Sequence, residues 1–443
     1  MSHAALGAAE AAALIRTGEL DAEALVGDCL ARIGEVDPAI EAWAYLDPDF
    51  ALAQAREADR TWRAGGSMGP LHGVPVGIKD IIDTADMPTE NGTPIHAGRR
   101  PEEDAWVVSL LLRAGAVILG KTVTTELAVY TPGKTRNPHD PERTPGGSSS
   151  GSAAAVAAAM VPVALGTQTN GSVIRPASYC GVFGYKPSHG LVSRSGVLPQ
   201  SRALDTVGLF ARGIDDLALL GSVIMGHDGR DPDMRPSAPP ALRELAAAEP
   251  PAGPDLAFVE TPVWAEATGD CKAAFAELVD VLGRHCEPLA LPEPFAEAVA
   301  WHRDILCPDI AHSFAPFYAR AKESLSARLV AMIEDGQALP AIDYIAALEG
   351  RKRLAAILDA AFDDYDAIVT PATTGAAPRG LDTTGSPIFC TLWTLCGNPS
   401  VSLPLLRDGD GMPIGVQLVG RRGDDARLLR TARWLTGQVE SAA

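Results

Sequence analysis

Short runs of apolar residues alternate with helix-like segments along most of the chain. A short apolar run bounded by turn residues is typical of a buried strand, whereas apolar positions three and four residues apart indicate a helix. The strands predicted in this way cover residues 74–78, 116–119, 161–165, 182–185, 367–370, 401–405 and 415–419. The helices predicted between and after them cover residues 104–113, 150–159 and 424–436. This alternation predicts the α/β class, with a sheet covered by helices on both faces.

The remaining stretches are predicted to be helical or to form a linker. Residues 8–35 have apolar positions at helical spacing with a break near Gly18, which predicts two short helices, and a third helix is expected over residues 50–63. Residues 226–254 are rich in Pro, Asp and Arg, which indicates a surface linker or excursion. Residues 262–355 are predicted to be mostly helical.

The net charge of the chain disfavours some classes of binding partner. With 56 acidic and 37 basic residues, the formal net charge is −19, which argues against nucleic acid or an anionic membrane as a partner. The longest uncharged apolar run, residues 153–166, is too short to span a bilayer, and no signal peptide is evident. Seven cysteines without metal-binding spacing indicate reduced thiols. We therefore expect a cytoplasmic protein with no membrane or nucleic-acid partner.

Two glycine-rich serine segments and one lysine carry the candidate chemistry. Residues 146–152 read Gly-Gly-Ser-Ser-Ser-Gly-Ser, residues 166–176 read Gly-Thr-Gln-Thr-Asn-Gly-Ser-Val-Ile-Arg-Pro, and Lys79 follows the apolar run 74–78. A partly desolvated lysine loses its charge and becomes a base. A serine in a glycine-rich turn exposes its hydroxyl beside free backbone N–H groups. A base, a hydroxyl and N–H donors are the parts required for acyl transfer.

Other interpretations of these segments stay open from the residues alone. The serines are also typical of helix N-caps or of a flexible linker, and Lys79 also suits a surface position or a pair with Asp80. Residues 147–151 match the Gly-x-Ser-x-Gly nucleophile elbow of the α/β-hydrolases, with Ser149 as nucleophile. That motif requires a strand directly before it. Residues 137–145 read as a loop, which disfavours the elbow.

With these motifs in this order, the chain resembles the amidase signature family of serine hydrolases. The resemblance rests on residues 77–80 (Gly-Ile-Lys-Asp), 146–149 (Gly-Gly-Ser-Ser) and 166–175, and on the spacing of Ser148 and Ser172. It implies one large domain with a central mixed, twisted β-sheet covered by helices on both faces. The parts expected within residues 1–443 are N-terminal helices (1–65), a catalytic core (70–225), a linker (226–254), a helical substrate-covering region (255–360) and a return to the core (361–443).

The resemblance also implies roles for individual residues. Ser172 would be the nucleophile, Ser148 a bridging serine that follows a cis peptide bond from Gly147, and Lys79 the base. The backbone N–H groups expected to form the oxyanion hole are those of Thr169, Asn170, Gly171 and Ser172. The chemistry implied is hydrolysis of a small-molecule amide through an acyl-enzyme, without a metal or an organic cofactor.

Two residues near the expected nucleophile depart from the family pattern. Asn170 stands where the family has glycine, and Gln168 where it has aspartate. Asparagine tolerates left-handed backbone angles better than most residues, so the turn is expected to survive. The Asn170 side chain would lie near the nucleophile and narrow the site or bind the substrate. Ser149, Asn170 and Arg175 form the expected substrate-binding set.

The motifs look most like the bacterial malonamidase branch of the family, and residues 392–398 share that likeness. In that branch the arginine matching Arg175 binds the substrate's carboxylate, which makes malonamate a candidate substrate. A guanidinium suits bidentate capture of an anion. Arg175 equally suits a structural ion pair, for instance with Asp205. A neutral aliphatic or aryl amide, an ester or a carbamate would then be the substrate.

Two other functions compete with a stand-alone amidase. The first is the amide-hydrolysing component (the A component) of a tRNA-dependent amidotransferase, which requires partner subunits, and the acidic balance of the chain gives no RNA surface. The second is a catalytically inactive binding protein, against which the intact set of Lys79, Ser148 and Ser172 argues. A homodimer is the assembly that the resemblance implies.

Overall fold

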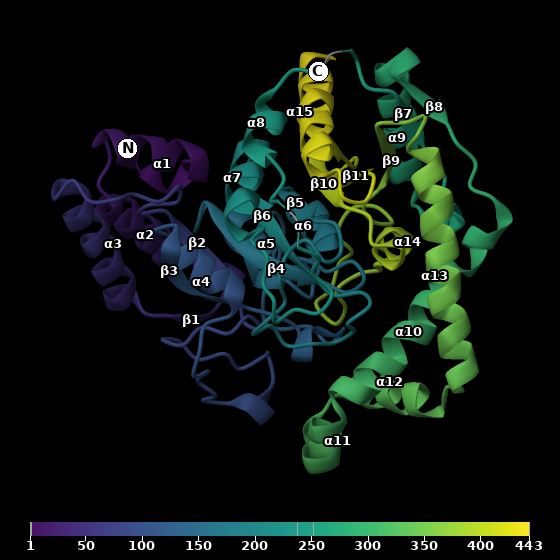
Figure 1. Cartoon of the computed structure of the whole chain (residues 1–443), viewed down its shortest axis with the longest axis horizontal. Helices are drawn as coiled ribbons and strands as arrows, with labels where there is room; N and C mark the ends of the chain where they lie inside the picture. The colour runs from purple at the N-terminus through teal and green to yellow at the C-terminus, as the bar shows by residue number, and fades with distance from the viewer. Residues whose placement is uncertain (1, 237, 251, 443) are drawn as a thin grey trace.

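A mixed β-sheet runs through the centre of the computed structural model, which describes residues 2–236, 238–250 and 252–442 (Figure 1). Within those residues the sheet has eleven strands in the order β1-β3-β2-β4-β6-β5-β10-β11-β9-β7-β8. The strands are β1 (Trp43–Leu46), β2 (Pro75–Lys79), β3 (Val117–Thr122), β4 (Val163–Gln168), β5 (Phe183–Lys186), β6 (Thr206–Ala211), β7 (Leu256–Phe258), β8 (Cys286–Pro288), β9 (Ala367–Pro371), β10 (Ser400–Arg407) and β11 (Pro413–Val419). Strand β2 is parallel to both β3 and β4, and β7 to both β8 and β9, while the strands between β4 and β9 pair antiparallel.

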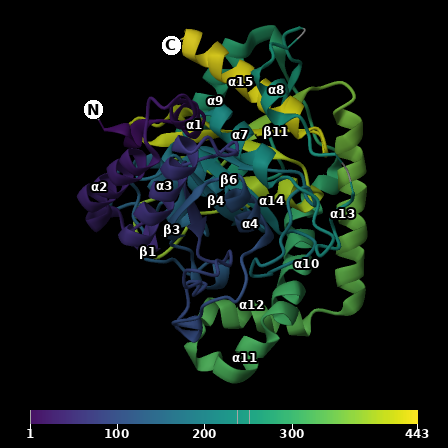
Figure 2. The same ribbon diagram turned by 60° about the vertical axis from the view of Figure 1, so that its left-hand side comes forward.

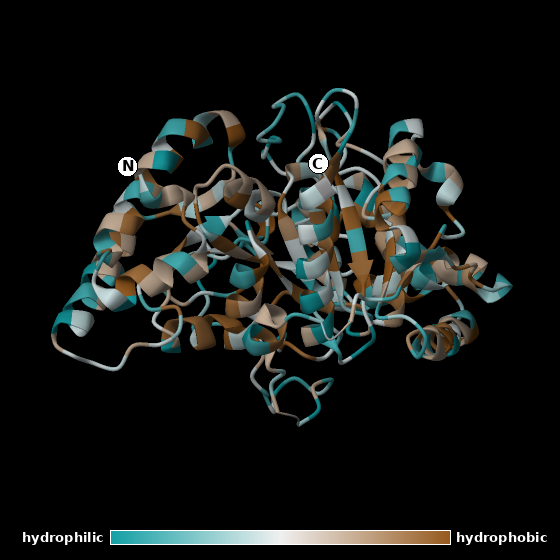
Figure 3. Ribbon diagram, turned by 90° about the horizontal axis from the view of Figure 1, so that it is seen from above, coloured by the Kyte–Doolittle hydropathy of each residue, from teal (hydrophilic) through white to brown (hydrophobic). Residues whose placement is uncertain are grey.

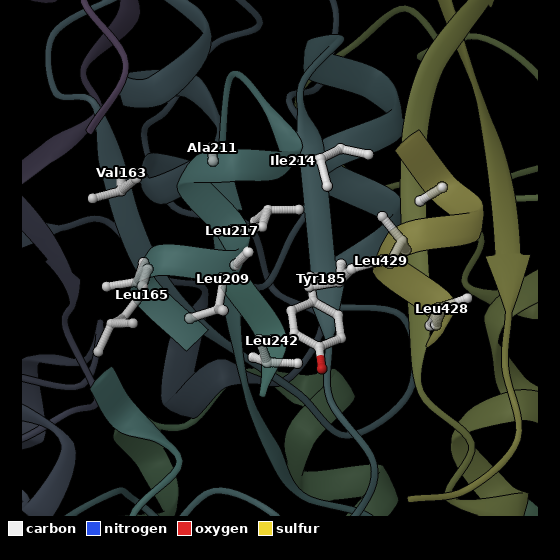
Figure 4. Packing of buried hydrophobic residues seen from close by; sticks show 14 of the residues in the cluster. Val163, Leu165, Tyr185, Leu209, Ala211, Ile214, Leu217, Leu242, Leu428 and Leu429 are labelled. Carbon is white, nitrogen blue, oxygen red and sulfur yellow. The ribbon is translucent and has the colours of Figure 1, made fainter. Parts of the chain in front are cut away.

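Alternation along the strands divides the apolar core between the two faces of the sheet. In β4, Val163 and Leu165 belong to one cluster of buried residues, and Ala164 belongs to the cluster on the opposite face. Figure 4 shows the first cluster, in which Leu217 and Leu428 from two helices point toward the strands. Figure 3 shows brown, apolar residues along the central strands.

Helices cover both faces. Those that contribute to the first cluster are α1 (Ala8–Thr17), α4 (Trp106–Arg113), α7 (Ile214–Ile224), α8 (Leu242–Ala247), α9 (Gly269–Leu282) and α15 (Asp425–Ala442). Those that contribute to the second are α2 (Ala22–Ile40), α3 (Pro48–Arg63), α5 (Ser150–Ala157) and α6 (Ile174–Cys180). The expected α/β architecture, with helices on both faces of a large mixed sheet, is confirmed.

A group of helices extends from one end of the sheet and forms a third apolar cluster. Its members are α10 (Ala298–Ser313), α11 (Ala315–Ala321), α12 (Ala327–Ala338), α13 (Ala341–Ala361) and α14 (Ile388–Cys396). Helix α10 packs against α12, α13 and α14. Figures 1 and 2 both show α11 and α12 projecting at the end of the molecule away from the chain termini. Along the described residues, no helix combines the length and the apolar character that crossing a membrane requires.

The hydrophobic pattern located most elements and missed a few. Every predicted strand overlaps a strand of the structure, and the predicted helices correspond to α3, α4, α5 and α15. Helix α2 continues through Pro38 to Ile40, beyond the predicted end at residue 35. Strands β1, β6, β7 and β8 were not predicted. Strands β7 and β8 are only three residues long, too short for a periodicity to be visible.

Residues 226–236 and 238–250 are mostly exposed and irregular, with a few buried side chains that attach the stretch to the rest of the fold. Asp228 and Asp231 are buried, where they accept hydrogen bonds from Ser193 and Arg194 respectively. Helix α8 lies in the same stretch and packs against α15 and α7. Residues 237 and 251 lie outside the described residues. Hydrogen bonds from Ser193 and Arg194 and the packing of α8 thus anchor this stretch to the rest of the fold.

The cysteines lie inside the fold. All seven are buried and none is in a disulfide. This agrees with the expectation of reduced thiols.

Helix α5 approaches the sheet closely at Gly151. A Cβ there would clash with the backbone of Ala42 and Val123. We expect Gly151→Ala to lower the free energy of unfolding by about 1–3 kcal/mol, the usual cost of overpacking. Urea denaturation measures this, with Gly27→Ala in α2 as the control because a Cβ at Gly27 meets nothing within 4 Å. Equal stability of the two variants would contradict the close approach.

Candidate active site

Lys79 is the last residue of β2 and is fully buried. Its Nζ donates to Ser148 Oγ at 2.7 Å and to Thr167 Oγ1 at 2.8 Å. Strands β2 and β4 are parallel neighbours, so Thr167 near the end of β4 lies at the same edge of the sheet as Lys79. Ser148 comes from the loop that leads into α5. The carboxyl ends of parallel strands are the usual place for a site in an open α/β sheet.

Burial is the main influence on the pKa of Lys79 and holds it well below the ordinary value of 10.5. The negative charge of Asp205 acts in the opposite direction, and the positive charge of Arg175 lowers the pKa further. Among the described residues, both hydrogen-bond partners of Nζ are neutral hydroxyls. Asp80, the other suggested partner, instead faces Lys121 at 3.9 Å. The site therefore favours the neutral amine.

Ser148 and Ser149 are adjacent but have different surroundings. The Gly147–Ser148 peptide is cis, and Ser148 is buried with its Oγ on Lys79. Ser149 Oγ donates to the carbonyl oxygen of Thr167 and accepts from its N–H, both at 3.2 Å. The hydroxyl of Ser149 is therefore occupied by the backbone of β4.

Ser172 lies in the turn between β4 and α6 and is 9% exposed. It lines a small cavity of about 20 Å³ together with Thr169, Asn170 and Arg175. Within the described part of the chain, the backbone N–H groups of Asn170, Gly171 and Ser172 donate to no protein acceptor. These N–H groups are therefore free to bind an oxygen atom placed beside Ser172.

Two polar side chains hold the turn before Ser172 from behind. Gln168 Oε1 accepts from the N–H groups of Val173 and Ile174 at 2.8 and 3.0 Å, which caps the first turn of α6. Gln168 Nε2 donates to Thr394 Oγ1 at 2.9 Å, and Thr394 Oγ1 donates to the carbonyl of Asn170 at 2.5 Å. The neutral Gln168 side chain thus fixes the turn without a charge.

Thr169 is held on both sides. Its hydroxyl donates to Asp205 at 2.6 Å, and Asp205 also accepts from the N–H groups of Gln200 and Ser201. Burial raises the pKa of Asp205 to about 6. His302 Nε2 of α10 lies 3.0 Å from the carbonyl of Thr169, and burial lowers the pKa of His302 to about 4, so the neutral ring donates here. Helix α10 thereby touches the turn directly.

Arg175 is 1% exposed and joins the two serine segments. Its Nε and Nη2 donate to the carbonyl of Gly147 at 3.1 and 2.6 Å, and its Nη1 donates to the carbonyl of Gly385 at 3.0 Å. The suggested ion pair of Arg175 with Asp205 is wrong, because Asp205 is bound to Thr169 and to two backbone N–H groups. Arg175 binds backbone carbonyls instead, one of which belongs to the cis peptide.

A larger cavity of about 340 Å³ adjoins the cavity at Ser172. Tyr130, Asn170 and Leu306 line both. Arg328 lies on its wall, with its guanidinium 4.4 Å from the centre of the Tyr130 ring. Residues 2–236, 238–250 and 252–442 contain no group of three or more His, Cys, Asp or Glu side chains placed to hold a metal ion.

The sequence singled out some of these residues and missed others. The structure brings Lys79 and Ser148 into contact and places Ser172, Asn170 and Arg175 on one cavity. The contacts of Tyr130, Thr167, His302, Thr391 and Thr394 were not foreseen. Thr394 lies within residues 392–398, which the motif comparison had marked, but nothing in that stretch indicated its partner.

Comparison with known proteins identifies the family. The sequence profile described as Amidase matches residues 24–429, most of the chain. The chain belongs to the amidase family. The expected amidase signature resemblance is thereby confirmed, while the closer likeness to the malonamidase branch stays a prediction.

Individual relatives of this amidase family member cover nearly all of it. The A component of the glutamyl-tRNA(Gln) amidotransferase of Chloroflexus aggregans is 35% identical over 465 residues, 94% of this chain and 93% of that protein. The putative amidase AmiD of Mycobacterium tuberculosis is 36% identical over 445 residues, 95% of this chain and 91% of that protein. The match to the corresponding component from Chloroflexus aurantiacus is 47% identical over 237 residues, but this chain covers only 48% of that relative.

Solved structures agree in fold. The peptide amidase from Stenotrophomonas maltophilia superposes with a TM-score of 0.86 at 32% identity, over 99% of this chain and 98% of that one. The 6-aminohexanoate cyclic dimer hydrolase in complex with substrate superposes with a TM-score of 0.87 at 27% identity, over 98% and 97%.

Proposed function

We propose that this protein hydrolyses a small-molecule amide through an acyl-enzyme on Ser172. The observation that carries the proposal is the fully buried Lys79, whose Nζ lies 2.7 Å from Ser148 Oγ in a member of the amidase family. The names of the peptide amidase and the cyclic dimer hydrolase support amides as the substrate class. Burial of the lysine and the free N–H groups before Ser172 supply a base and an oxyanion site.

The proposed reaction runs in two halves. Neutral Lys79 accepts the hydroxyl proton of Ser148, Ser148 accepts that of Ser172, and the Ser172 oxygen attacks the carbonyl carbon. The N–H groups of Asn170, Gly171 and Ser172 bind the oxyanion, with Thr169 at the start of the same turn. The proton returns through Ser148 to the leaving nitrogen as the C–N bond breaks. Water then attacks the acyl ester on Ser172 by the same proton route and releases the acid.

Surrounding residues keep the base in position. Thr167 Oγ1 accepts one N–H of Lys79. We propose that the contact between Nζ and Ser148 Oγ reverses during the reaction, so that the lone pair of the neutral amine accepts the Ser148 proton. Arg175 holds the carbonyl of the Gly147–Ser148 peptide from the opposite side. We propose that Ser149 is structural, because its hydroxyl is bound to the backbone of Thr167.

The substrate is proposed to be a neutral amide. Arg175 is buried and already donates to two backbone carbonyls, so its charge is directed to the protein rather than to a substrate carboxylate. Malonamate, esters and carbamates are the competing substrates.

A second candidate function is that of an amidotransferase component that acts on glutamine together with partner subunits. The match to such a component over 94% of this chain favours it.

Three variants test the proposed roles. We expect Ser172→Ala and Lys79→Met each to lower kcat by roughly 10⁴-fold or more, because the nucleophile and its base act as a unit. Ser149→Ala should keep turnover and lose stability, since a buried N–H left without its acceptor costs about 1–3 kcal/mol. Amide hydrolysis and thermal unfolding measure the two effects. Loss of activity in Ser149→Ala alone would support the nucleophile-elbow alternative.

The pH profile tests the buried base. Lys79 acts only when neutral, so kcat/KM should rise as pH increases through its pKa and then level off. Because burial lowers that pKa well below 10.5, the rise should be complete far below pH 10. Stopped assays between pH 5 and 11 measure kcat/KM over about six pH units, a range in which Lys79 passes from the protonated to the neutral form. A rise centred near the ordinary lysine value would contradict a desolvated Lys79.

A substrate panel tests the amide class. The purified chain alone should release ammonia from neutral amides such as propanamide and malonamide at least as fast as from malonamate, with Ser172→Ala as the blank. A preference for malonamate would make Arg175 a carboxylate clamp. Activity on glutamine that appears only when the chain is co-purified with partner subunits would support the amidotransferase alternative.

A further inference from the structure

The Asn170 side chain bridges two elements on either side of the turn before Ser172. Its Nδ2 donates to the Tyr130 hydroxyl at 3.1 Å, and its Oδ1 accepts from Thr391 Oγ1 at 2.8 Å. Tyr130 belongs to the loop after β3, and Thr391 belongs to α14. The backbone of Asn170 is held as well, because its carbonyl accepts from Thr394 of α14. Asn170 is thus fixed by three hydrogen bonds.

This bridge lies between two cavities of very different size. The cavity at Ser172 measures about 20 Å³, which is room for about one water molecule. The larger cavity, which Asn170 also lines, measures about 340 Å³, and its walls combine apolar side chains such as Val299 and Met332 with the charged Arg303, Arg328 and Asp335. Asn170 and Tyr130 line both cavities. The bridge therefore limits how much of a substrate fits beside the nucleophile.

A glycine at position 170 would have no side chain to place there. The Asn170 amide occupies the space between Tyr130 and Thr391 and uses one donor and one acceptor to do so. The Tyr130 hydroxyl accepts from Asn170 and keeps its own proton. The ring of Tyr130 is stacked under Arg328, which restrains it from the outer side. Movement of the bridge therefore requires the two hydrogen bonds of the Asn170 amide and the contact of Tyr130 with Arg328 to break together.

We propose that the Tyr130–Asn170–Thr391 bridge determines acyl-group specificity by narrowing the space between the two cavities. This inference rests on the proposed function of Ser172. Substrates would be carboxamides whose acyl group is unbranched at the carbon next to the carbonyl, so that the chain passes beside Asn170, with any bulk further along the chain lying in the larger cavity. Acyl groups branched at that carbon would meet the Asn170 amide.

The test uses two isomeric probes of equal composition, propane-1-sulfonyl fluoride and propane-2-sulfonyl fluoride. Each sulfonylates a reactive serine, as the oxygen–sulfur bond forms and fluoride leaves with the serine proton. Rate constants for labelling of Ser172 are measured by intact mass and peptide mapping for the wild type, Asn170→Ala, Thr391→Val and Tyr130→Phe. The ratio of the branched to the linear rate constant is compared between variants, which cancels the intrinsic reactivity of each probe.

We expect Asn170→Ala to raise this ratio by roughly tenfold or more, since one methyl group in a fitted pocket is worth about 10–200-fold. Thr391→Val and Tyr130→Phe keep the volume but remove one hydrogen bond each, and should raise the ratio by a smaller factor. They also keep the test valid if Asn170→Ala does not fold, which thermal unfolding reports.

Matched controls lie away from the site. Thr436→Val removes a threonine hydroxyl that donates to a helix carbonyl in α15, and Tyr318→Phe removes a tyrosine hydroxyl that binds Glu334. Both should leave the ratio unchanged. An unchanged ratio in the three bridge variants, with Ser172 labelled normally, would overturn the inference alone. Absence of any labelling of Ser172 in the wild type would overturn the proposed nucleophile and the inference with it.

Discussion

Burial of one lysine among neutral hydroxyls is the constraint on which the rest of the site depends. A charged ammonium in that position would lose its hydration without a contacting carboxylate to replace it, so the neutral form is favoured. Asp205 is close enough to oppose the effect electrostatically, yet its oxygens are taken by Thr169 and by two backbone N–H groups. The fold thus provides a counter-charge near Lys79 without a direct ion pair.

The position of β2 in the sheet makes this burial achievable. Strand β2 lies between β3 and β4, with helix α5 packed across it, so the end of the strand is covered from several directions. Arg175 of α6 then holds the carbonyl of Gly147, and Gln168 caps the first turn of the same helix. The guanidinium of Arg175 and the amide of Gln168 therefore bind backbone groups next to the serines. This explains how a buried guanidinium persists in the interior of an acidic protein.

The helices outside the sheet take part in the site as well as covering it. His302 of α10 binds the carbonyl of Thr169, and Thr391 and Thr394 of α14 bind Asn170. The turn before Ser172 is therefore held by helices that also line the larger cavity. A substitution in α10 or α14 can therefore alter both the shape of that cavity and the geometry of the turn. This arrangement links the shape of the larger cavity with the free N–H groups beside Ser172, the proposed nucleophile.

The α/β class and the principal strands could be read from the amino-acid sequence alone, and the residues suited to acyl transfer could be predicted from it. Runs of apolar residues indicated the strands because buried strands require apolar side chains. The two glycine-rich serine segments and Lys79 indicated acyl transfer because together they supply hydroxyls, N–H donors and a base. Which side chains come into contact could not be predicted in this way, because it depends on how distant elements pack. Residues 130, 170 and 391 are far apart in the chain, as are Lys79 and Thr167, and no local pattern encodes their contact. Arg175 was suggested to bind either a substrate carboxylate or Asp205, and its partners in the structure are backbone carbonyls. A hydrogen-bond partner in the interior is chosen by the packing of distant elements, whereas a strand or a helix is chosen largely by its own residues.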